Sequence, residues 1–367
     1  MSHAETAVMS RLWVLGAPDP EMAAIEALLL ECGERFVHAR DAAGARVTPG
    51  NAYRAACPTE LTGGFGEALS VVYRVECHWD WSEESLNCRV VSLDHHHPGD
   101  YGYGARPRDF LGASSLGQVI AELFDFKALP SWPHKVFEFS PFALSSEWLV
   151  SERRGRRLAV PRSLVLTAAA DHCLGAAYRG ECPGVEPEAL MRFRAEERAR
   201  FQGRSVDAVL ADIAETTLAL MRQDIRRLEL AGYEHAEHTT DHDWQKSVCS
   251  GCSDYPLVVA DMRTCPVCDG RGALTGNPDA TAPCHHGPRG PWPELVETAT
   301  RTNRPYVSGP LRVPDGRAKY TCSGSARIIT AFFEWAEREG LVDAYGDPAR
   351  GFAGAYARAN AAEKRSP

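Results

Sequence analysis

The sequence lacks long hydrophobic runs, and this absence excludes a membrane-spanning helix. A helix that crosses a bilayer needs about 20 consecutive apolar residues. The longest apolar runs here, near residues 12–15 and 164–170, are much shorter and are bounded by charged residues or proline. The N-terminus, Met1–Glu5, has neither a basic start nor an apolar core, so it does not resemble a secretory signal. We therefore expect a cytoplasmic protein with no membrane partner.

Positive charge is also scarce. The chain has 40 Lys and Arg against 49 Asp and Glu, a formal net charge of −9, so any contact with nucleic acid would need a local basic patch. Hydrophobic and charged residues make up 44% and 24% of the chain, as in ordinary globular proteins, which excludes a fibre, a coiled coil or wholesale disorder. With 367 residues, the chain exceeds what a single core usually supports, and we expect two domains.

Cysteine, by contrast, is abundant for a cytoplasmic chain, with twelve residues. Two Cys-x2-Cys pairs stand close together in a stretch rich in Gly, Pro and His; they are Cys249, Cys252, Cys265 and Cys268. Two such turns place four thiolates at tetrahedral distances around Zn²⁺. We therefore predict a structural zinc ribbon over 234–292, with a redox dithiol as the alternative. A closed four-cysteine site leaves no open position for catalysis.

Other residues near the predicted ribbon allow more than one interpretation. Cys284, His285 and His286 can supply an alternative ligand or a second site, although a loop is the favoured interpretation. Arginines such as Arg263 and Arg271 favour contact with nucleic acid or a partner protein, or form a solvated basic face. The remaining cysteines are interpreted as mostly buried small apolar residues; they are Cys32, Cys57, Cys77, Cys88, Cys173, Cys182 and Cys322.

The hydrophobic pattern predicts an α/β fold. Short apolar runs at 11–15, 69–75 and 89–93 predict strands, and they alternate with stretches of helical spacing at 21–32 and 116–124. This order favours a parallel sheet with helices on both faces. The run over 163–169 fits a strand or the start of a helix. Helical spacing recurs over 187–230, with a break near Gly203, and over 326–339. The predicted domains are 1–180, a helical connector at 181–233, the ribbon at 234–292, and a smaller α/β C-terminal domain at 293–367.

The most informative segment is Leu93-Asp94-His95-His96-His97, directly after a predicted strand. A carboxylate and imidazoles at the exit of a strand favour a metal or phosphate site, because the ends of parallel strands open into a crevice. The alternative is a solvated surface loop.

The order of four motifs resembles the DHH phosphoesterase superfamily, whose members hydrolyse phosphoesters and phosphoanhydrides of nucleotides and oligonucleotides. The matching segments are Leu15-Gly16-Ala17-Pro18-Asp19-Pro20-Glu21, Glu76 at the end of a strand, Asp94-His95-His96 with the later Ala113-Ser114-Ser115, and Asp171 after a run of small residues. The alternatives are a helix cap at Asp19, a surface charge at Glu76 and a buried Asp171–His172 pair.

The resemblance implies a DHH-like fold with Mn²⁺, or Mg²⁺, bound by carboxylates. It places Asp19 and Glu76 at a first ion, and Glu21, Glu76, His95 and Asp171 at a second. Asp94 and His96 would be catalytic, with His96 facing the phosphate of a nucleotide or short oligonucleotide. The alternatives are a catalytically silent nucleotide- or nucleic-acid-binding module and a zinc-ribbon protein that binds a partner.

The sequence departs from the family pattern at three ligand positions. Leu15 replaces the histidine that opens the first motif, and Glu21 and Glu76 replace aspartates. A single-metal site, a relocated site and no site all remain open. His78, beside Trp79, is an extra ligand or part of an aromatic packing cluster, with packing favoured.

In the same family, a glycine-rich loop in the second domain binds the phosphate of the substrate. The similarly placed residues here are Ser323, Gly324 and Ser325, ahead of a helix. They fit a phosphate-binding turn or an ordinary helix cap.

Overall fold

The computed structural model describes residues 10–62, 69–79, 88–125, 148–151, 156–230, 257–259, 284–286, 294–308, 311–312 and 317–358. The chain forms two compact units, Met1–Arg194 and Ala195–Pro367. Their boundary falls inside a helix of the segment that was predicted to be a helical connector. The four cysteines of the predicted zinc site, Cys249, Cys252, Cys265 and Cys268, lie outside the described residues.

The first unit is built on a parallel sheet of four strands in the order β2-β1-β3-β4. These strands are β1 (Arg11–Leu15), β2 (Phe36–His38), β3 (Val71–Val75) and β4 (Arg89–Leu93). Strands β1 and β3 pair in register from Arg11 with Val71 to Leu15 with Val75. The predicted strands are confirmed, with the second starting at Val71 rather than at 69. Strand β2 has only three residues, all partly buried, and such a segment carries no periodicity from which to predict it.

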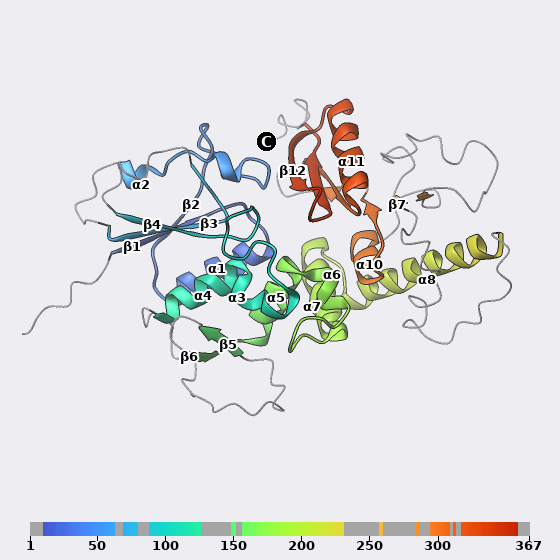
Figure 1. The fold of residues 1–367 in the computed structure, drawn as a ribbon, viewed down its shortest axis with the longest axis horizontal. Helices are drawn as coiled ribbons and strands as arrows, with labels where there is room; N and C mark the ends of the chain where they lie inside the picture. Colours follow the sequence, from blue (N-terminus) through green and yellow to red (C-terminus); the bar gives the residue numbers. More distant parts are fainter. Residues whose placement is uncertain are drawn as a thin grey trace, which may run out of the picture. The chain divides into compact units, whose positions relative to one another are not determined.

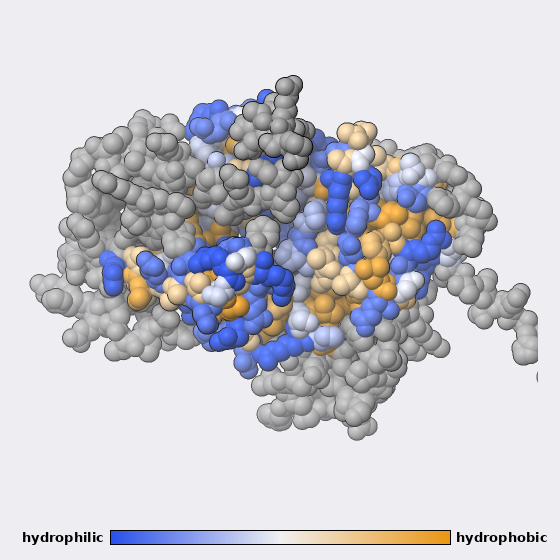
Figure 2. Space-filling model, turned by 180° about the vertical axis from the view of Figure 1, so that it is seen from behind, coloured by the Kyte–Doolittle hydropathy of each residue, from blue (hydrophilic) through white to orange (hydrophobic). Residues whose placement is uncertain are grey.

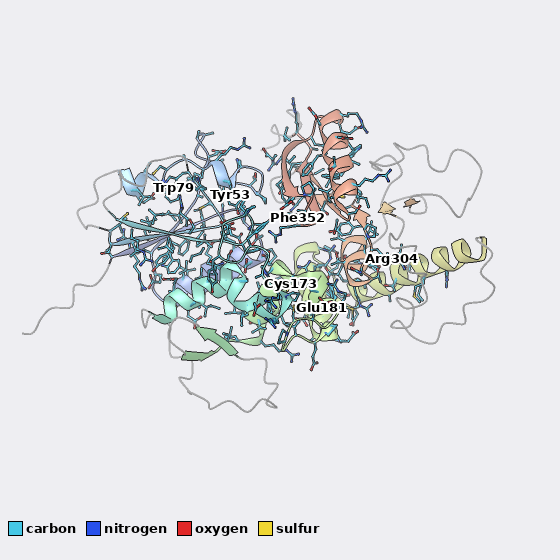
Figure 3. All side chains as sticks on the ribbon, viewed as in Figure 1. Tyr53, Trp79, Cys173, Glu181, Arg304 and Phe352 are labelled. Atoms are coloured by element: carbon cyan, nitrogen blue, oxygen red, sulfur yellow. The ribbon has the colours of Figure 1, made fainter. Side chains whose placement is uncertain are left out.

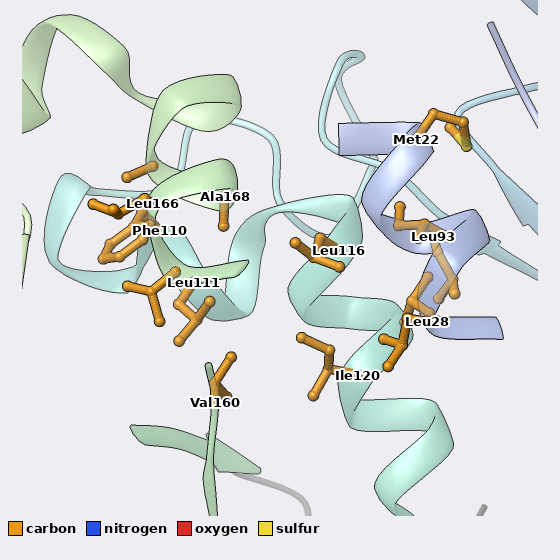
Figure 4. Close-up of a cluster of buried hydrophobic side chains, with 14 of the residues drawn as sticks. Met22, Leu28, Leu93, Phe110, Leu111, Leu116, Ile120, Val160, Leu166 and Ala168 are labelled. Atoms are coloured by element: carbon orange, nitrogen blue, oxygen red, sulfur yellow. The ribbon is translucent and has the colours of Figure 1, made fainter. Parts of the chain in front are cut away.

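Four helices cover one face of this sheet (Figure 1): α1 (Pro20–Glu31), α3 (Phe110–Ala113), α4 (Ser115–Asp125) and α5 (Arg162–His172). Trp13 and Tyr73 form the sheet side of the core and stack with ring centroids 4.1 Å apart. Figure 4 shows Met22, Leu116 and Ala168 in the same core cluster. Burial of each large apolar side chain stabilises the fold by about 1.5–3 kcal/mol. The packing of this core therefore holds the four helices in place relative to the ends of the strands.

The opposite face of the sheet is covered differently. Leu12, Val14 and Val72 pack against the segment 39–62, which contains the 3₁₀ helix η1 (Ala52–Arg54) and the short helix α2 (Thr59–Thr62). Figure 3 shows Tyr53 and Trp79 on this side. The α/β class is confirmed. Helices were predicted on both faces of the sheet, but this second face is covered only by the short helices η1 and α2.

The ambiguous run over 163–169 is helical and belongs to α5. Pro161 precedes the helix, and the Thr167 hydroxyl donates to the Ser163 carbonyl at 2.9 Å. The short helix α6 (Leu174–Tyr178) follows, and β5 (Trp148–Ser151) and β6 (Arg156–Ala159) form an antiparallel pair.

Two long helices, α7 (Pro187–Gln202) and α8 (Val206–Leu230), occupy the predicted helical segment. They are separated at Gly203, which adopts a φ of +64°, a conformation that glycine takes without a steric penalty. The predicted break is therefore confirmed.

The second unit contains a mixed sheet in the order β12-β13-β11-β9-β7-β8, with β10 paired to β11. Its strands are β7 (Leu257–Val259), β8 (Cys284–His286), β9 (Tyr306–Val307), β10 (Leu311–Arg312), β11 (Ala318–Ser323), β12 (Val342–Asp347) and β13 (Phe352–Tyr356). Helix α11 (Ala326–Arg338) packs on the sheet through Phe332 and Trp335, and α10 (Leu295–Arg301) packs on α8 through Leu295. The helix predicted at 326–339 is confirmed. The loop favoured at Cys284–His286 is wrong, because these residues pair with β7 as a strand.

No helix among the described residues is long and apolar enough to span a bilayer. Figure 2 shows hydrophilic residues beside smaller hydrophobic patches on the described part of one face. Three large apolar side chains are exposed among the described residues, at Leu30, Tyr101 and Leu218.

Candidate metal centre

The candidate site lies at the carboxyl ends of three adjacent strands. The chain leaves β1 into α1, which carries Glu21, and Glu76 directly follows β3. Asp94 and His95 directly follow β4. Because β1 leads to β2 on one side and β3 leads to β4 on the other, the ends of β1 and β3 form a topological switch point, where ligands bind in open α/β sheets.

Four side chains predicted as ligands of one ion come together at this point. Glu21, Glu76, His95 and Asp171 each offer a ligand atom within 4.8 Å of the others. His95 Nε2 lies 3.2 Å from Asp171 Oδ2, and His95 Nδ1 lies 3.8 Å from Glu76 Oε1. His95 Nδ1 also lies 3.2 Å from the Ser115 hydroxyl. The fold therefore assembles a carboxylate–histidine cluster that could bind a metal ion.

Two buried carboxylate oxygens in the cluster have no hydrogen-bond partner. Glu21 is 0% exposed; its Oε1 accepts the Leu116 N–H at 3.0 Å, but its Oε2 is unpaired. Glu76 is 6% exposed, and its Oε1 likewise has no hydrogen-bond partner, although His95 Nδ1 lies 3.8 Å away. Unpaired buried oxygens of this kind are costly unless a cation or a proton neutralises them. The donor set thus fits a divalent cation that prefers oxygen and imidazole ligands.

The carboxylates of the cluster perturb one another. Burial, followed by the charges of Asp171 and Glu76, raises the pKa of Glu21. Burial, followed by the same neighbours, also raises the pKa of Asp19. For Asp171 the pKa moves the other way: desolvation raises it, but the hydrogen bond and charge of His95 outweigh that effect and lower it. Ionisation of all these carboxyl groups together is therefore unfavourable unless a cation offsets their charge.

Glu76 is held in an unusual backbone conformation. Its φ is +50°, a left-handed value that costs a non-glycine residue about 1–3 kcal/mol. The Glu76 N–H nevertheless donates to the Leu93 carbonyl at 3.2 Å. Strain of this kind clusters at functional sites, and here it falls on a residue predicted to bind both ions.

Asp94 organises the loop after β4. Its Oδ1 accepts the backbone N–H of His95 at 2.7 Å and that of His96 at 3.0 Å, and lies 2.9 Å from His96 Nδ1. Its Oδ2 accepts the Tyr53 hydroxyl at 2.9 Å. Burial would raise the pKa of Asp94, but the hydrogen bond and charge of His96 lower it. Asp94 is therefore a positioning residue for His96.

The three histidines after Asp94 have different environments. His95 is 1% exposed, His96 is partly buried and stacks on His95 at 4.2 Å, and His97 is exposed. Burial disfavours the charged form of His96, but the Glu76 carboxylate and the hydrogen bond to Asp94 raise its pKa to about 9. A solvated histidine loop is thus excluded for His95, which is buried.

Tyr53 was not predicted as a site residue, because it lies 41 positions before Asp94 and no motif marks it. We expect Tyr53→Phe to lower the free energy of unfolding by about 2 kcal/mol, since it removes a hydrogen bond to a charged group. Chemical denaturation measures this difference. The matched control is Tyr101→Phe, at a 70% exposed position, which should change stability by less than about 0.5 kcal/mol. Equal effects of the two substitutions would contradict a role for Tyr53 in holding Asp94.

The backbone of Gly102 lies close to the side chain of His95 and to the Ala113 carbonyl, and this packing helps to hold His95 in place. A Cβ at Gly102 would lie 1.9 Å from the Ala113 carbonyl oxygen and 2.6 Å from His95 Cβ. We therefore expect Gly102→Ala to lower the free energy of unfolding by about 3 kcal/mol, as measured by chemical denaturation. At Gly112 in α3, no atom lies within 4 Å of the added Cβ, and alanine is the better helix former. Gly112→Ala should therefore not destabilise the protein, and a stable Gly102→Ala variant would show that this packing is not needed.

The first of the two predicted ions has less support from the structure than the second. Asp19 caps α1, accepting the Met22 N–H at 2.7 Å, as the alternative interpretation had it. Its pKa responds to Glu76 and Asp171, but no group of three potential ligands among the described residues includes it. Leu15, where the family has a histidine, is fully buried in the core. His78 is exposed and belongs to no such described group, whereas Trp79 is buried in packing.

Two further groups of potential ligands lie next to the main cluster. One joins Glu76 and His95 to His96, and the other joins Asp94 to His97 and Asp100. In the second group, the His97 N–H donates to Asp100 Oδ2 at 2.7 Å, as in a polar turn. Gln118 was not predicted either; its Nε2 donates to the carbonyls of Asp94 and Ala113, both at 2.9 Å.

The predicted phosphate-binding residues lie in the second unit. Ser325 is the N-cap residue of α11 by position, but its side chain makes no capping hydrogen bond. The Gly324 N–H donates to the Gly351 carbonyl at 2.9 Å, so this N–H is not available to an anion. The turn at Ser323–Ser325 thus has one donor fewer for phosphate than its sequence predicts.

The fold and the site define an α/β protein whose parallel sheet carries a carboxylate–histidine cluster that could bind a metal ion. No protein-family model, curated protein or solved structure in the comparisons matches this chain.

Proposed function

We propose that this protein is a divergent DHH-type phosphoesterase that uses Mn²⁺ or Mg²⁺ to hydrolyse a phosphoester of a nucleotide or short oligonucleotide. The observation that carries the proposal is the presence of two buried carboxylate oxygens without a hydrogen-bond partner, on Glu21 and Glu76, within the four-residue cluster. Their desolvation is costly without a cation, and their position at a topological switch point is where a substrate would bind.

The residues of the cluster have distinct roles in this proposal. Glu21, Glu76, His95 and Asp171 would hold the ion, which supplies a Lewis acid for the phosphoryl group. His96 would donate a hydrogen bond to a phosphate oxygen through Nε2, because its Nδ1 faces Asp94. Asp94 fixes the orientation of the His96 ring through Nδ1. Tyr53 in turn fixes Asp94 through its second oxygen.

We place His96 beside the substrate rather than at the ion, because its Nδ1 faces Asp94 at 2.9 Å and it is not one of the four side chains of the main cluster. We propose one ion at the main cluster, since four side chains that could hold an ion come together there. The structural zinc at Cys249, Cys252, Cys265 and Cys268 remains a separate proposal from the sequence.

The test is elemental analysis by mass spectrometry of the purified full chain, with and without added Mn²⁺. Wild type is compared with a His95→Ala, Asp171→Ala double variant and with a His97→Ala control. The control removes the exposed histidine of the same run. We expect one zinc in all three proteins and manganese in wild type and the control alone. A screen of nucleotide phosphoesters then follows, in which the double variant should show no turnover.

Two results would contradict the proposal. In the first, wild type and the double variant both contain zinc and no manganese. This result would contradict a metal-dependent reaction and favour a nucleotide- or nucleic-acid-binding module. Manganese retained by the double variant would place the ion elsewhere. Loss of fold in the double variant, seen by circular dichroism, is distinguished from loss of the ion by repeating the analysis with Asp171→Asn, which keeps the size and polarity of the side chain.

A further inference from the structure

Two cysteines lie close together just after the candidate metal centre. Cys173 stands between α5 and α6, and Cys182 lies in the segment that returns from α6. Their sulfur atoms are 3.0 Å apart, about 1 Å more than the roughly 2.05 Å of a disulfide bond. The interpretation as a buried residue is confirmed for Cys182, whereas Cys173 is only partly buried, and the closeness of the two sulfur atoms was not predicted.

The two thiols differ in their exposure. Cys182 is 2% exposed, whereas Cys173 is partly exposed, and both are free. Figure 3 shows Cys173 near Glu181, the residue before Cys182. A small reagent can therefore reach Cys173, and the second sulfur already lies beside it, so that bond formation requires only a small shift of the short segment between them.

The pair is connected to the candidate metal centre through α5. Cys173 is two residues after Asp171, and its N–H donates to the Ala169 carbonyl at 3.2 Å. Asp171 Oδ2 lies 3.2 Å from His95 Nε2. A covalent bond at Cys173 therefore acts on the last turn of the helix that carries Asp171.

We propose that Cys173 and Cys182 form a reversible disulfide, which fixes the end of α5 and thereby the position of Asp171 in the metal centre. The formation of the disulfide stands on the geometry of the two cysteines alone, whereas its effect on metal binding rests on the proposed function.

The oxidant is a small-molecule disulfide such as glutathione disulfide. One cysteine thiolate attacks it and releases one small thiol, and the second cysteine then attacks the mixed disulfide and releases another. Two S–H bonds and the S–S bond of the reagent break. The Cys173–Cys182 bond and two small thiols form, so that two electrons and two protons pass to the reagent.

The expected consequence is tighter metal binding in the oxidised protein. Asp171 is the most exposed of the four clustered side chains, at 27%, and a cross-link two residues away reduces the freedom that it loses when an ion binds. We expect about tenfold higher Mn²⁺ affinity after oxidation. Because coupling is reciprocal, saturating Mn²⁺ should lower the midpoint potential of the pair by about 30 mV.

The first experiment detects the bond itself. The full chain is equilibrated in glutathione buffers of increasing oxidation, alkylated, digested with trypsin and analysed by mass spectrometry. Cleavage after Arg162, Arg179 and Arg192 separates the two cysteines. A disulfide therefore joins peptides 163–179 and 180–192. We expect this linked pair to accumulate with oxidation and to disappear on reduction. Its absence in the most oxidising buffer would overturn the proposal.

The second experiment measures Mn²⁺ binding to the oxidised and reduced protein by isothermal titration calorimetry. Wild type should show the tenfold difference, and Cys182→Ser should show none. Cys173→Ser provides the same comparison at the more exposed position in case the buried substitution impairs folding. Cys32→Ser, at a partly buried cysteine after α1, is the control that keeps the difference.

The outcomes separate the two proposals. Equal affinities in the two redox states of wild type would overturn the coupling to Asp171. A linked peptide pair together with no Mn²⁺ binding in either state would overturn the proposed function and leave the disulfide standing. Loss of the difference in Cys32→Ser as well would show that the effect does not come from Cys173 and Cys182.

Discussion

The Glu21→Gln variant should bind Mn²⁺ at least 100-fold more weakly than wild type, yet its metal-free form should be more stable by about 2 kcal/mol near neutral pH. Glutamine keeps the acceptor for the Leu116 N–H and replaces the unpaired Oε2 with an amide donor. It also removes the ionisable group at a site where burial, followed by the charges of Asp171 and Glu76, raises the pKa of Glu21. The same substitution should therefore weaken Mn²⁺ binding and raise the free energy of unfolding of the metal-free protein.

The sign of the pH dependence follows from this raised pKa. The folded state retains the Glu21 proton above the unfolded-state value of 4.5, so the contribution of Glu21 to stability is present at low pH and is lost as the pH rises. Glutamine is neutral throughout. The difference between variant and wild type should therefore vanish below about pH 4.5 and grow above it.

Chemical denaturation in the presence of a chelator, at acidic and neutral pH, measures the stability difference, and calorimetry measures Mn²⁺ affinity. Glu31→Gln on the exposed end of the same helix is the matched control and should change both quantities little. A metal-free Glu21→Gln variant that is less stable than wild type at neutral pH would show that the carboxylate cluster carries no unfavourable charge.

His96→Ala should lower kcat for a phosphoester substrate by about 1,000-fold while changing Mn²⁺ affinity by less than about threefold. In the protein without an ion, the Glu76 carboxylate and the hydrogen bond to Asp94 outweigh burial and raise the pKa of His96 to about 9. A bound cation offsets the charge of Glu76 and so lowers this pKa. As the pH rises, the wild-type rate should therefore begin to fall below about pH 9, because the imidazolium loses its proton. The variant should lack this alkaline limb.

The kcat of wild type and variant is measured between neutral pH and about pH 10, and metal content is determined on the same samples. His97→Ala is the control, since His97 is exposed and is not one of the side chains of the main cluster; we expect near-normal turnover from it. If His96→Ala loses the ion instead, then His96 is a ligand in the group with Glu76 and His95.

The strands that carry the site could be predicted, because each is a short apolar run followed at once by polar residues. Val71–Val75 leads into Glu76, and Arg89–Leu93 leads into Asp94. Parallel strands bring such ends to one edge of the sheet, so the meeting of Glu76 with His95 follows from the α/β pattern. The position of Asp171 came only from the resemblance, since the run before it fitted both a strand and a helix.

Other parts of the site could not be predicted from a single sequence. Tyr53 and Gln118 reach Asp94 from distant segments, and no local pattern marks side chains that meet only in the folded chain. The φ of Glu76 is set by tertiary contacts against its own preference. The adjacency of Cys173 and Cys182 depends on the chain reversal around α6, which is too short to give a periodic signal.

The wide spacing of the cluster along the chain sets the order of events in folding. Glu21 and Asp171 are separated by most of the first unit, and β1 pairs with β3 across more than fifty residues. Contacts of such high sequence separation are slow to form, so the ligand set is complete only when the whole unit has assembled. An ion at the cluster would therefore leave the rate of folding nearly unchanged and slow unfolding instead. The ion would therefore lengthen the lifetime of the folded unit once that unit has assembled.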